Sequence, residues 1–251
     1  RFPQGNLKRG QVPAVKKRLV HHLHQASVAE VVFTDTFQSD DAKHACGQAF
    51  VCYRSRFGHV VCIKSRREVG KAFRRFCADV FRPLILVRDN ISEQKFGEMM
   101  DACVEMMVQS AFSTPYTPEE DYAEGFIGRV CQLASFAMLY AGAPTFMWRF
   151  AIISAVFVYN LTAGWYSAEQ LWATPYELVY GEPFPDSSIM MPWGCGALIL
   201  LRKEEREKFG SRCALVVFAH CATQHPTYCY AFWNPKTGRI LYRRDAIFLV
   251  D

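Results

Sequence analysis

The chain has 251 residues, of which 51% are hydrophobic and 21% are charged, a composition that excludes a mainly disordered protein. Its net charge of +5 comes from one end, because residues 1–29 hold six basic side chains and no acid. The longest apolar stretch, Phe150–Tyr159, is bounded by Arg149 and Asn160 and falls short of the roughly 18–20 residues that a membrane span needs. We therefore expect no membrane partner.

The ten cysteines are dispersed through apolar runs, such as those around Cys52 and Cys62, and no pair has CxxC spacing. This pattern is typical of reduced thiols packed in a core, and it supports neither a disulfide scaffold nor a cysteine-based zinc site. It predicts a reducing, intracellular compartment.

Residues 1–29 are rich in turn-forming and basic residues and indicate an N-terminal arm or linker. Lys and Arg side chains displace counterions from phosphates, so this arm is a candidate DNA contact. A solvated linker is the alternative. The candidate DNA-binding residues are Lys8, Arg9, Lys16, Lys17 and Arg18.

Three β-rich runs follow, at Val31–Phe37, Gln48–Arg54 and His59–Lys64. The short turn Ser55–Gly58 separates the second run from the third. Successive strands with short connections predict an antiparallel meander.

Apolar residues at helical spacing predict a helix over Arg67–Phe81, which Pro83 stops. Leu84–Val87 is a continuous apolar run that predicts a strand buried on both faces. A helix over Glu93–Met106 and a fifth strand over Met107–Phe112 complete a β-β-β-α-β-α-β order. This order predicts an α/β fold with a mixed five-stranded sheet flanked by helices.

Two long helices are expected next, over Glu119–Tyr140 and Thr145–Thr162. The second is rich in aromatic residues, which could form a stacking platform, but its many Ile and Val residues favour a buried or interface helix. Residues 166–192 contain several prolines and predict an extended connector. Five short strands predict a small β-barrel-like module over residues 193–251: Ala197–Leu201, Cys213–Ala219, Tyr228–Trp233, Ile240–Arg243 and Ala246–Val250.

Three acidic residues occupy positions that a sheet can bring together. Asp35 lies in the first strand, Asp89 ends the fourth, and Glu124 lies in the first turns of the long helix. Clustered carboxylates repel one another unless a cation lies between them, and Mg²⁺ prefers such oxygen ligands. The spacing also admits a structural interpretation, with Asp89 as a turn residue and Glu124 as an acid that complements the helix dipole.

Several ordered segments resemble the integrase of copia-type LTR retrotransposons, within the retroviral integrase group. Val32–Asp35 resembles the strand of the first catalytic Asp, and Leu86–Asn90 resembles the strand that ends in the second. Thr114–Glu124, with its Pro-Tyr-Thr-Pro start, is similar to the segment that carries the catalytic Glu. Further matches follow in order at Ala143–Trp148, Thr174–Pro183, Trp193–Cys195, Phe232–Ile240 and Arg244–Phe248.

The resemblance implies an RNase H-like catalytic core over residues 30–165 and a polynucleotidyl transferase that performs 3′-end processing and DNA strand transfer. Asp35, Asp89 and Glu124 would bind two Mg²⁺ or Mn²⁺ ions, with Thr34 and Asn90 as hydrogen-bond donors beside them. The implied partners are element-end DNA, target DNA and further copies of the chain as a homo-oligomer. The implied location is the nucleus.

The sequence departs from the family pattern near the predicted site. Ile91 and Ser92 replace two glycines, Gly125 replaces an Arg, and Glu119 and Glu120 replace glutamines. These changes favour a diverged copy. The alternatives are a catalytically decayed or domesticated DNA-binding scaffold, or an RNase H-like nuclease that only hydrolyses.

Overall fold

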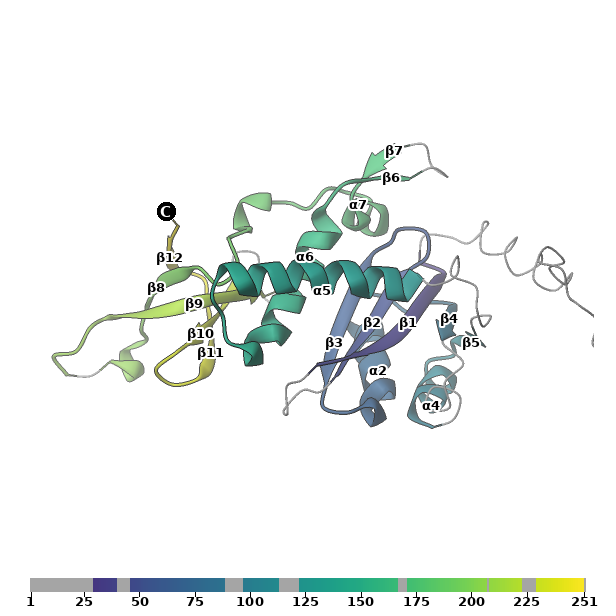
Figure 1. Ribbon diagram of the computed structural model, residues 1–251, viewed down its shortest axis with the longest axis horizontal. Coiled ribbons are helices and arrows are strands. Elements are labelled where there is room, and N and C mark those ends of the chain that lie inside the picture. The colour runs from purple at the N-terminus through teal and green to yellow at the C-terminus, as the bar shows by residue number, and fades with distance from the viewer. Residues whose placement is uncertain are drawn as a thin grey trace, which may run out of the picture.

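The computed structural model describes residues 29–39, 46–88, 97–112, 122–166, 171–206, 208–222 and 229–250. They form a sheet flanked by helices, followed by a second sheet at the opposite end of the molecule (Figure 1). No described helix is long and apolar enough to span a membrane.

The first sheet has the strand order β3-β2-β1-β4-β5. Strands β1 (Val31–Gln38), β2 (Cys46–Cys52) and β3 (Gly58–Ile63) are antiparallel neighbours, which confirms the predicted meander. Strands β4 (Ile85–Arg88) and β5 (Gln109–Phe112) run parallel to β1. The second strand begins two residues earlier than its sequence predicts, but every expected strand of this sheet is present.

Helices α2 (Val69–Asp79) and α4 (Glu98–Glu105) cover one face of this sheet. A 3₁₀ turn over Arg66–Glu68 leads into α2, where the sequence predicts the start of the helix. Phe50 of β2 stacks on Phe76 of α2 with ring centroids 4.7 Å apart, so the apolar stripe of the helix closes directly on the sheet.

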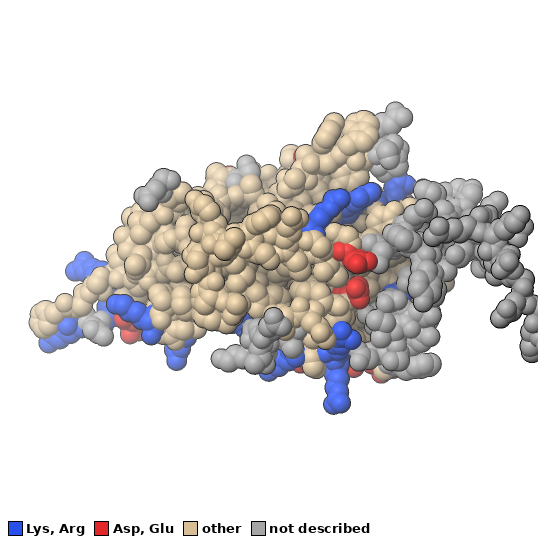
Figure 2. Space-filling model, in the orientation of Figure 1, with Lys and Arg blue, Asp and Glu red and all other residues tan. Residues whose placement is uncertain are grey.

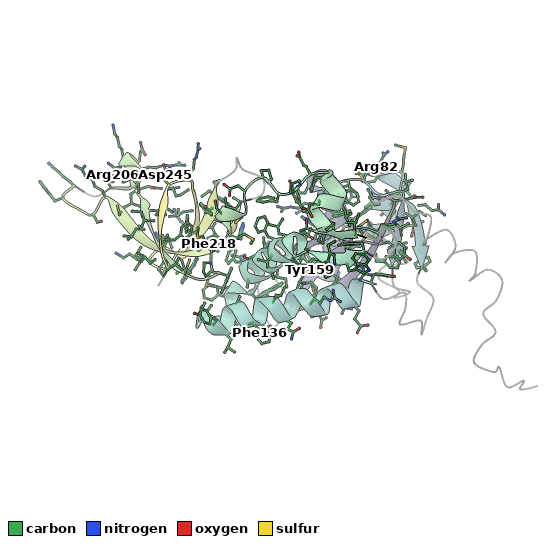
Figure 3. The ribbon with its side chains drawn as sticks, turned by 90° about the horizontal axis from the view of Figure 1, so that it is seen from above. Arg82, Phe136, Tyr159, Arg206, Phe218 and Asp245 are labelled. Atoms are coloured by element: carbon green, nitrogen blue, oxygen red, sulfur yellow. The ribbon has the colours of Figure 1, made fainter. Side chains whose placement is uncertain are left out.

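Helices α5 (Tyr122–Tyr140) and α6 (Trp148–Leu161) cover the other face, with a 3₁₀ turn over Thr145–Met147 before α6. Both helices are confirmed within the described residues. The inward residues of α5 recur at helical spacing: Ala123, Phe126, Val130 and Ala134. Figure 3 shows α5 running along one side of the molecule, with Phe136 pointing outwards.

The aromatic residues of the α6 region pack mainly as core, as expected. Phe150 is buried, and Trp148, Phe157 and Tyr159 are partly buried against neighbouring elements. Phe146 is exposed on one side and contacts Trp233 of the C-terminal module, with ring centroids 5.5 Å apart. These rings join the two parts of the molecule.

The segment predicted as an extended connector contains regular structure. A hairpin of β6 (Gly164–Tyr166) and β7 (Leu171–Ala173) is followed by α7 (Pro175–Tyr180). Thr174 and Glu177 form a capping box around the start of α7, so the Thr-Pro-x-Glu signal for a helix was present in the sequence. Pro175 is the first residue of α7, where a proline is tolerated, and the other prolines of the segment follow the helix.

The C-terminal module contains the five expected strands: β8 (Gly196–Leu200), β9 (Cys213–Cys221), β10 (Tyr230–Asn234), β11 (Arg239–Arg243) and β12 (Ala246–Leu249). They form one antiparallel sheet in the order β11-β10-β9-β8-β12. Phe218, labelled in Figure 3, contacts Phe232 and Phe248 in the core of this module. None of the ten cysteines forms a disulfide, in agreement with the expectation of core thiols.

Candidate active site

Asp35 lies on β1, on the face of the sheet that α5 covers. Side chains alternate between the two faces of a strand, and Val31 and Phe33, which share the face of Asp35, belong to the apolar cluster beneath α5 and α6. The Asp35 side chain is partly buried, and its Oδ1 accepts the backbone N–H of Thr36 at 2.7 Å. The strand therefore presents this carboxylate on the α5 side of the sheet.

The end of β4 lies beside this part of β1. The two strands are parallel, in a register that pairs Thr34 with Arg88. These are the residues immediately before Asp35 and Asp89 in the sequence. Asp89 and Asn90 themselves lie outside the described residues, so their predicted roles stay predictions.

Glu124 lies in the first turn of α5, and this turn packs over β1. The ring of Tyr122 is 5.2 Å from that of Phe33 and 4.9 Å from that of Tyr53, measured between centroids. Phe33 is two residues from Asp35 on the same face of the strand, and Tyr122 is two residues from Glu124. The structure thus brings together the elements that carry two of the three predicted carboxylates, and Glu124 is exposed to solvent there.

Acidic and basic side chains lie next to each other on this face. Figure 2 shows a small acidic area beside a strip of Lys and Arg near the N-terminal end of α5, below the β6–β7 hairpin. Side chains of both charges therefore adjoin on this face of the molecule.

Thr34 hydrogen-bonds to β2 rather than to a carboxylate. Its Oγ1 donates to the backbone carbonyl of Ala49 at 2.7 Å and accepts from Nε2 of Gln48 at 2.6 Å. Consecutive residues of a strand point to opposite faces, so the Thr34 side chain lies on the face away from Asp35. This corrects the expectation that Thr34 donates to the site, because its hydroxyl instead strengthens the pairing of β1 with β2.

Arg88, the last residue of β4, is fully buried. Its guanidinium donates to the hydroxyl of Ser110 and to Sδ of Met100 at 3.6 Å, and it lies 5.0 Å from the ring centroid of Phe112. Burial lowers the pKa of this guanidinium. The side chain ties the end of β4 to β5 and α4, and the only sequence signal for it was a charge at the end of an apolar run.

The donor chemistry of the site suits a hard divalent cation. Asp35 and Glu124 offer carboxylate oxygens, which are the ligands that Mg²⁺ prefers. Among the described residues no group of three His, Cys, Asp or Glu side chains could hold a metal ion. The third predicted ligand, Asp89, lies outside the described residues. The two predicted ligands that are described, Asp35 and Glu124, fit Mg²⁺ because both are carboxylates.

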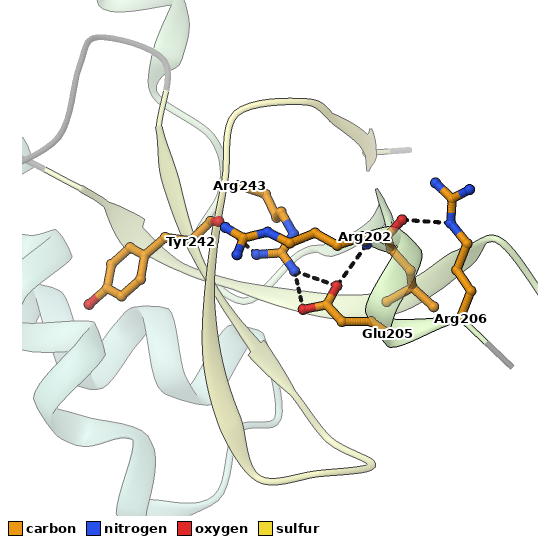
Figure 4. A network of polar contacts seen from close by, with 6 residues as sticks. Arg202, Glu205, Arg206, Tyr242 and Arg243 are labelled. Atoms are coloured by element: carbon orange, nitrogen blue, oxygen red, sulfur yellow. Dashed lines mark hydrogen bonds and ion pairs between the residues drawn. The ribbon is translucent and has the colours of Figure 1, made fainter.

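The predicted nucleic-acid contacts of the arm, Lys8, Arg9, Lys16, Lys17 and Arg18, lie outside the described residues. In the C-terminal module, Nη2 of Arg243 donates to both carboxylate oxygens of Glu205 at 2.7 Å (Figure 4). This hydrogen bond lowers the pKa of Glu205. The ion pair ties β11 to the segment between β8 and β9, so Arg243 has a structural partner.

Two arginines near the site were not singled out from the sequence. Arg54 and Arg56 lie in the turn between β2 and β3, and the Arg56 guanidinium lies 5.7 Å from the ring centroid of Tyr122. The signal was an Arg-x-Arg pair at the junction of the predicted second strand, which ends at Arg54, and the predicted turn that holds Arg56; by itself this indicates only a solvated loop.

No family model and no curated protein matches this chain. Solved structures do. The HTLV-2 integrase catalytic core domain in complex with magnesium matches in its trimeric form (17% identity, TM-score 0.50) and in its dimeric form (18% identity, TM-score 0.50). Each match covers 61% of this chain and 98% of the other.

A third match extends over almost the whole chain. The simian T-cell lymphotropic virus intasome, in complex with the PP2A regulatory subunit B56 gamma, matches at 15% identity and a TM-score of 0.53. The match covers 96% of this chain and 80% of the other. The mixed five-stranded sheet with its flanking helices is therefore the RNase H-like fold of retroviral integrase cores, as the sequence predicts.

Proposed function

We propose that this chain is an integrase-like polynucleotidyl transferase that performs 3′-end processing and strand transfer of element DNA. The observation that carries the proposal is the meeting of three elements on an RNase H-like fold. Asp35 on β1 faces α5, the first turn of α5 with Glu124 packs over β1, and β4 ends beside Asp35 just before Asp89. The copia-type assignment rests on the sequence resemblance alone.

In this proposal Asp35, Asp89 and Glu124 hold two Mg²⁺ or Mn²⁺ ions. When bound, the ions would supply activation of a water or a 3′-hydroxyl and stabilisation of the leaving oxygen. The chain's contribution is to hold three carboxylates together although they repel one another. The backbone N–H of Thr36 helps to orient the carboxylate of Asp35. The similar HTLV-2 integrase cores are in complex with magnesium, which supports this choice of metal.

The proposed partners are element-end DNA and target DNA, with the N-terminal arm as a further DNA contact. We also propose a homo-oligomer that acts in the nucleus. The matched integrase structures include a dimer, a trimer and an intasome, which supports a multimeric assembly.

The test incubates the full chain with labelled element-end DNA and Mg²⁺ or Mn²⁺. Joined products that disappear in Asp35→Asn, Asp89→Asn and Glu124→Gln are expected. Glu98→Gln is the matched control, because Glu98 is also an exposed first-turn acid but lies on α4, on the other face of the sheet. Hydrolysis without joining would identify a nuclease, and DNA binding without either reaction would identify a scaffold.

A second readout does not depend on activity. Mn²⁺ binding followed by electron paramagnetic resonance should weaken in each of the three variants and remain unchanged in Glu98→Gln. Without metal, Asp89→Asn should leave the melting temperature unchanged or raise it, because it relieves carboxylate repulsion. A fall of several degrees would instead make Asp89 a structural residue.

A further inference from the structure

The turn between β2 and β3 places two arginines beside the first turn of α5. It is closed by backbone hydrogen bonds, from the N–H of Cys52 to the carbonyl of Phe57 at 2.9 Å and from the N–H of Arg56 to the carbonyl of Cys52 at 3.0 Å. Arg54 is partly buried and Arg56 is exposed. The turn therefore presents cationic side chains next to the helix that carries Glu124.

Arg56 occupies a backbone conformation that disfavours a side chain. Its φ is +57°, in the left-handed region that glycine adopts without steric cost. Residues kept in this region against their preference concentrate at functional sites, and the observed outlier justifies a functional hypothesis. Met107 and Phe209 also have a positive φ, so the conformation alone assigns no function; Arg56 differs from them in placing its guanidinium 5.7 Å from the ring centroid of Tyr122, at the start of α5.

The turn is held rigidly by two elements from later in the chain. The side chain of Asn160 on α6 accepts the N–H of Gly58 at 2.8 Å and donates to its carbonyl at 2.8 Å. The hydroxyl of Tyr166 on β6 donates to the carbonyl of Ser55 at 2.9 Å, and Ser55 is fully buried. A turn fixed in this way presents its side chains at little further cost in conformational entropy.

A third arginine, Arg129, lies in the same region as Arg54 and Arg56. Arg129 lies on α5 and is exposed, and it and Arg56 are both close enough to Tyr159 for their charges to favour its phenolate form. Burial is the larger effect and raises the pKa of Tyr159. Tyr53 is likewise close to both Arg54 and Arg56. Tyr53 packs against Tyr122 and Tyr159 packs against Phe126, so the charges of these arginines act on rings that contact the first turns of α5.

Between Glu124 and Arg129, the exposed surface of α5 includes two positions without a side chain. Gly125 and Gly128 are exposed, and a Cβ at either position would meet no atom within 4 Å. Glycine destabilises the interior of a helix relative to alanine, so packing does not account for these two residues. Without side chains at these two positions, the helix backbone is accessible from solvent.

We propose that Arg54, Arg56 and Arg129 bind the sugar-phosphate backbone of a nucleic-acid strand that passes over Gly125 and Gly128 to Glu124. Guanidinium groups suit this role because they are always charged and pair with phosphate oxygens in a bidentate manner. Arg56 is a positioning residue in this scheme. The inference rests on the proposed function for the identity of the substrate, since it takes the polyanion to be nucleic acid.

The experiment measures binding of a fluorescent duplex by anisotropy, without divalent metal, over a series of salt concentrations. Arg56→Gly in the full chain should weaken binding about eightfold near 0.1 M salt. It should also reduce the salt slope, which is the slope of the logarithm of the binding constant against the logarithm of the salt concentration, by about 0.9. These are the amounts that the loss of one phosphate contact implies. Its melting temperature should stay the same or rise, because glycine relieves the positive φ. Arg54→Ala and Arg129→Ala should reduce the slope similarly.

Two control variants separate charge from backbone effects. Met107→Gly relieves a similar φ of +53° at an exposed site and should leave DNA binding unchanged. Arg67→Ala removes an exposed cation just before α2, on the other face of the sheet, and should also leave the slope unchanged.

Wild-type affinity and slope in Arg56→Gly would overturn the proposal, as would a large loss of thermal stability, which would make Arg56 structural. No DNA binding by the wild-type chain would overturn both this proposal and the proposed function. The expected binding results without any DNA joining or cleavage would support this inference and leave the catalytic proposal unsupported. Normal joining with unchanged binding in Arg56→Gly would refute this inference alone.

Discussion

Asn160 is expected to be among the most important polar side chains for stability, because it bridges α6 and the start of β3. Its amide makes two hydrogen bonds of 2.8 Å to the N–H and carbonyl of Gly58, and both residues are buried. Asn160→Ala removes both partners from buried backbone groups, each at a cost of about 1–3 kcal/mol. The free energy of unfolding should therefore fall by about 2–6 kcal/mol.

At about 2–4 °C per kcal/mol for a chain of this size, this loss corresponds to a fall in melting temperature of about 4–24 °C. It can be measured by guanidinium denaturation and by calorimetry. Asn160→Asp keeps the acceptor for the Gly58 N–H but at neutral pH buries a carboxylate oxygen against the Gly58 carbonyl oxygen, so it should destabilise at least as much as Asn160→Ala. Gln132→Ala, an exposed substitution on α5, is the control and should change stability by less than about 0.5 kcal/mol. A loss below about 1 kcal/mol in Asn160→Ala would refute the reasoning.

Two further predictions concern a partly buried histidine and a pair of glycines. Burial lowers the pKa of His59 to about 4, with Asp79 opposing and Arg75 assisting the shift. The pKa of a histidine in the unfolded chain is near 6.5, so the neutral His59 of the folded protein contributes its full stability above pH 6.5. This contribution is lost as the pH falls towards 4, and the loss reaches about 2 kcal/mol at pH 5. His59→Gln should remove this part of the pH dependence in denaturation curves, and an unchanged curve would contradict it. Gly128→Ala should stabilise the protein by about 0.5–1 kcal/mol, because the added Cβ would lie in open space. Gly70→Ala should destabilise it by about 1–3 kcal/mol, because the Cβ would overlap the backbone of α4. Equal changes in the melting temperatures of the two variants would argue against both predictions.

The helices and strands were largely predictable because their signals are local. Alternating and continuous apolar runs marked the strands, and helical spacing marked α2, α5 and α6. The hairpin β6–β7 was missed, because the hydrogen bond from Tyr166 to Ser55 joins residues remote in sequence. Helix α7 was missed although its capping box was visible, because the prolines around it dominated the interpretation.

By itself, the sequence determined the order of the elements in the two five-stranded sheets and in the helices α2, α4, α5 and α6, and it singled out the three acidic residues proposed as ligands. Only the tertiary structure decided the rest. The parallel register of β1 and β4 places Arg88 beside Thr34, strand alternation turns Thr34 away from Asp35, and the left-handed backbone at Arg56 fixes a cation over Tyr122. The physical reason is that periodicity and propensity act between near neighbours, whereas register, burial and backbone strain depend on contacts between segments far apart in the chain.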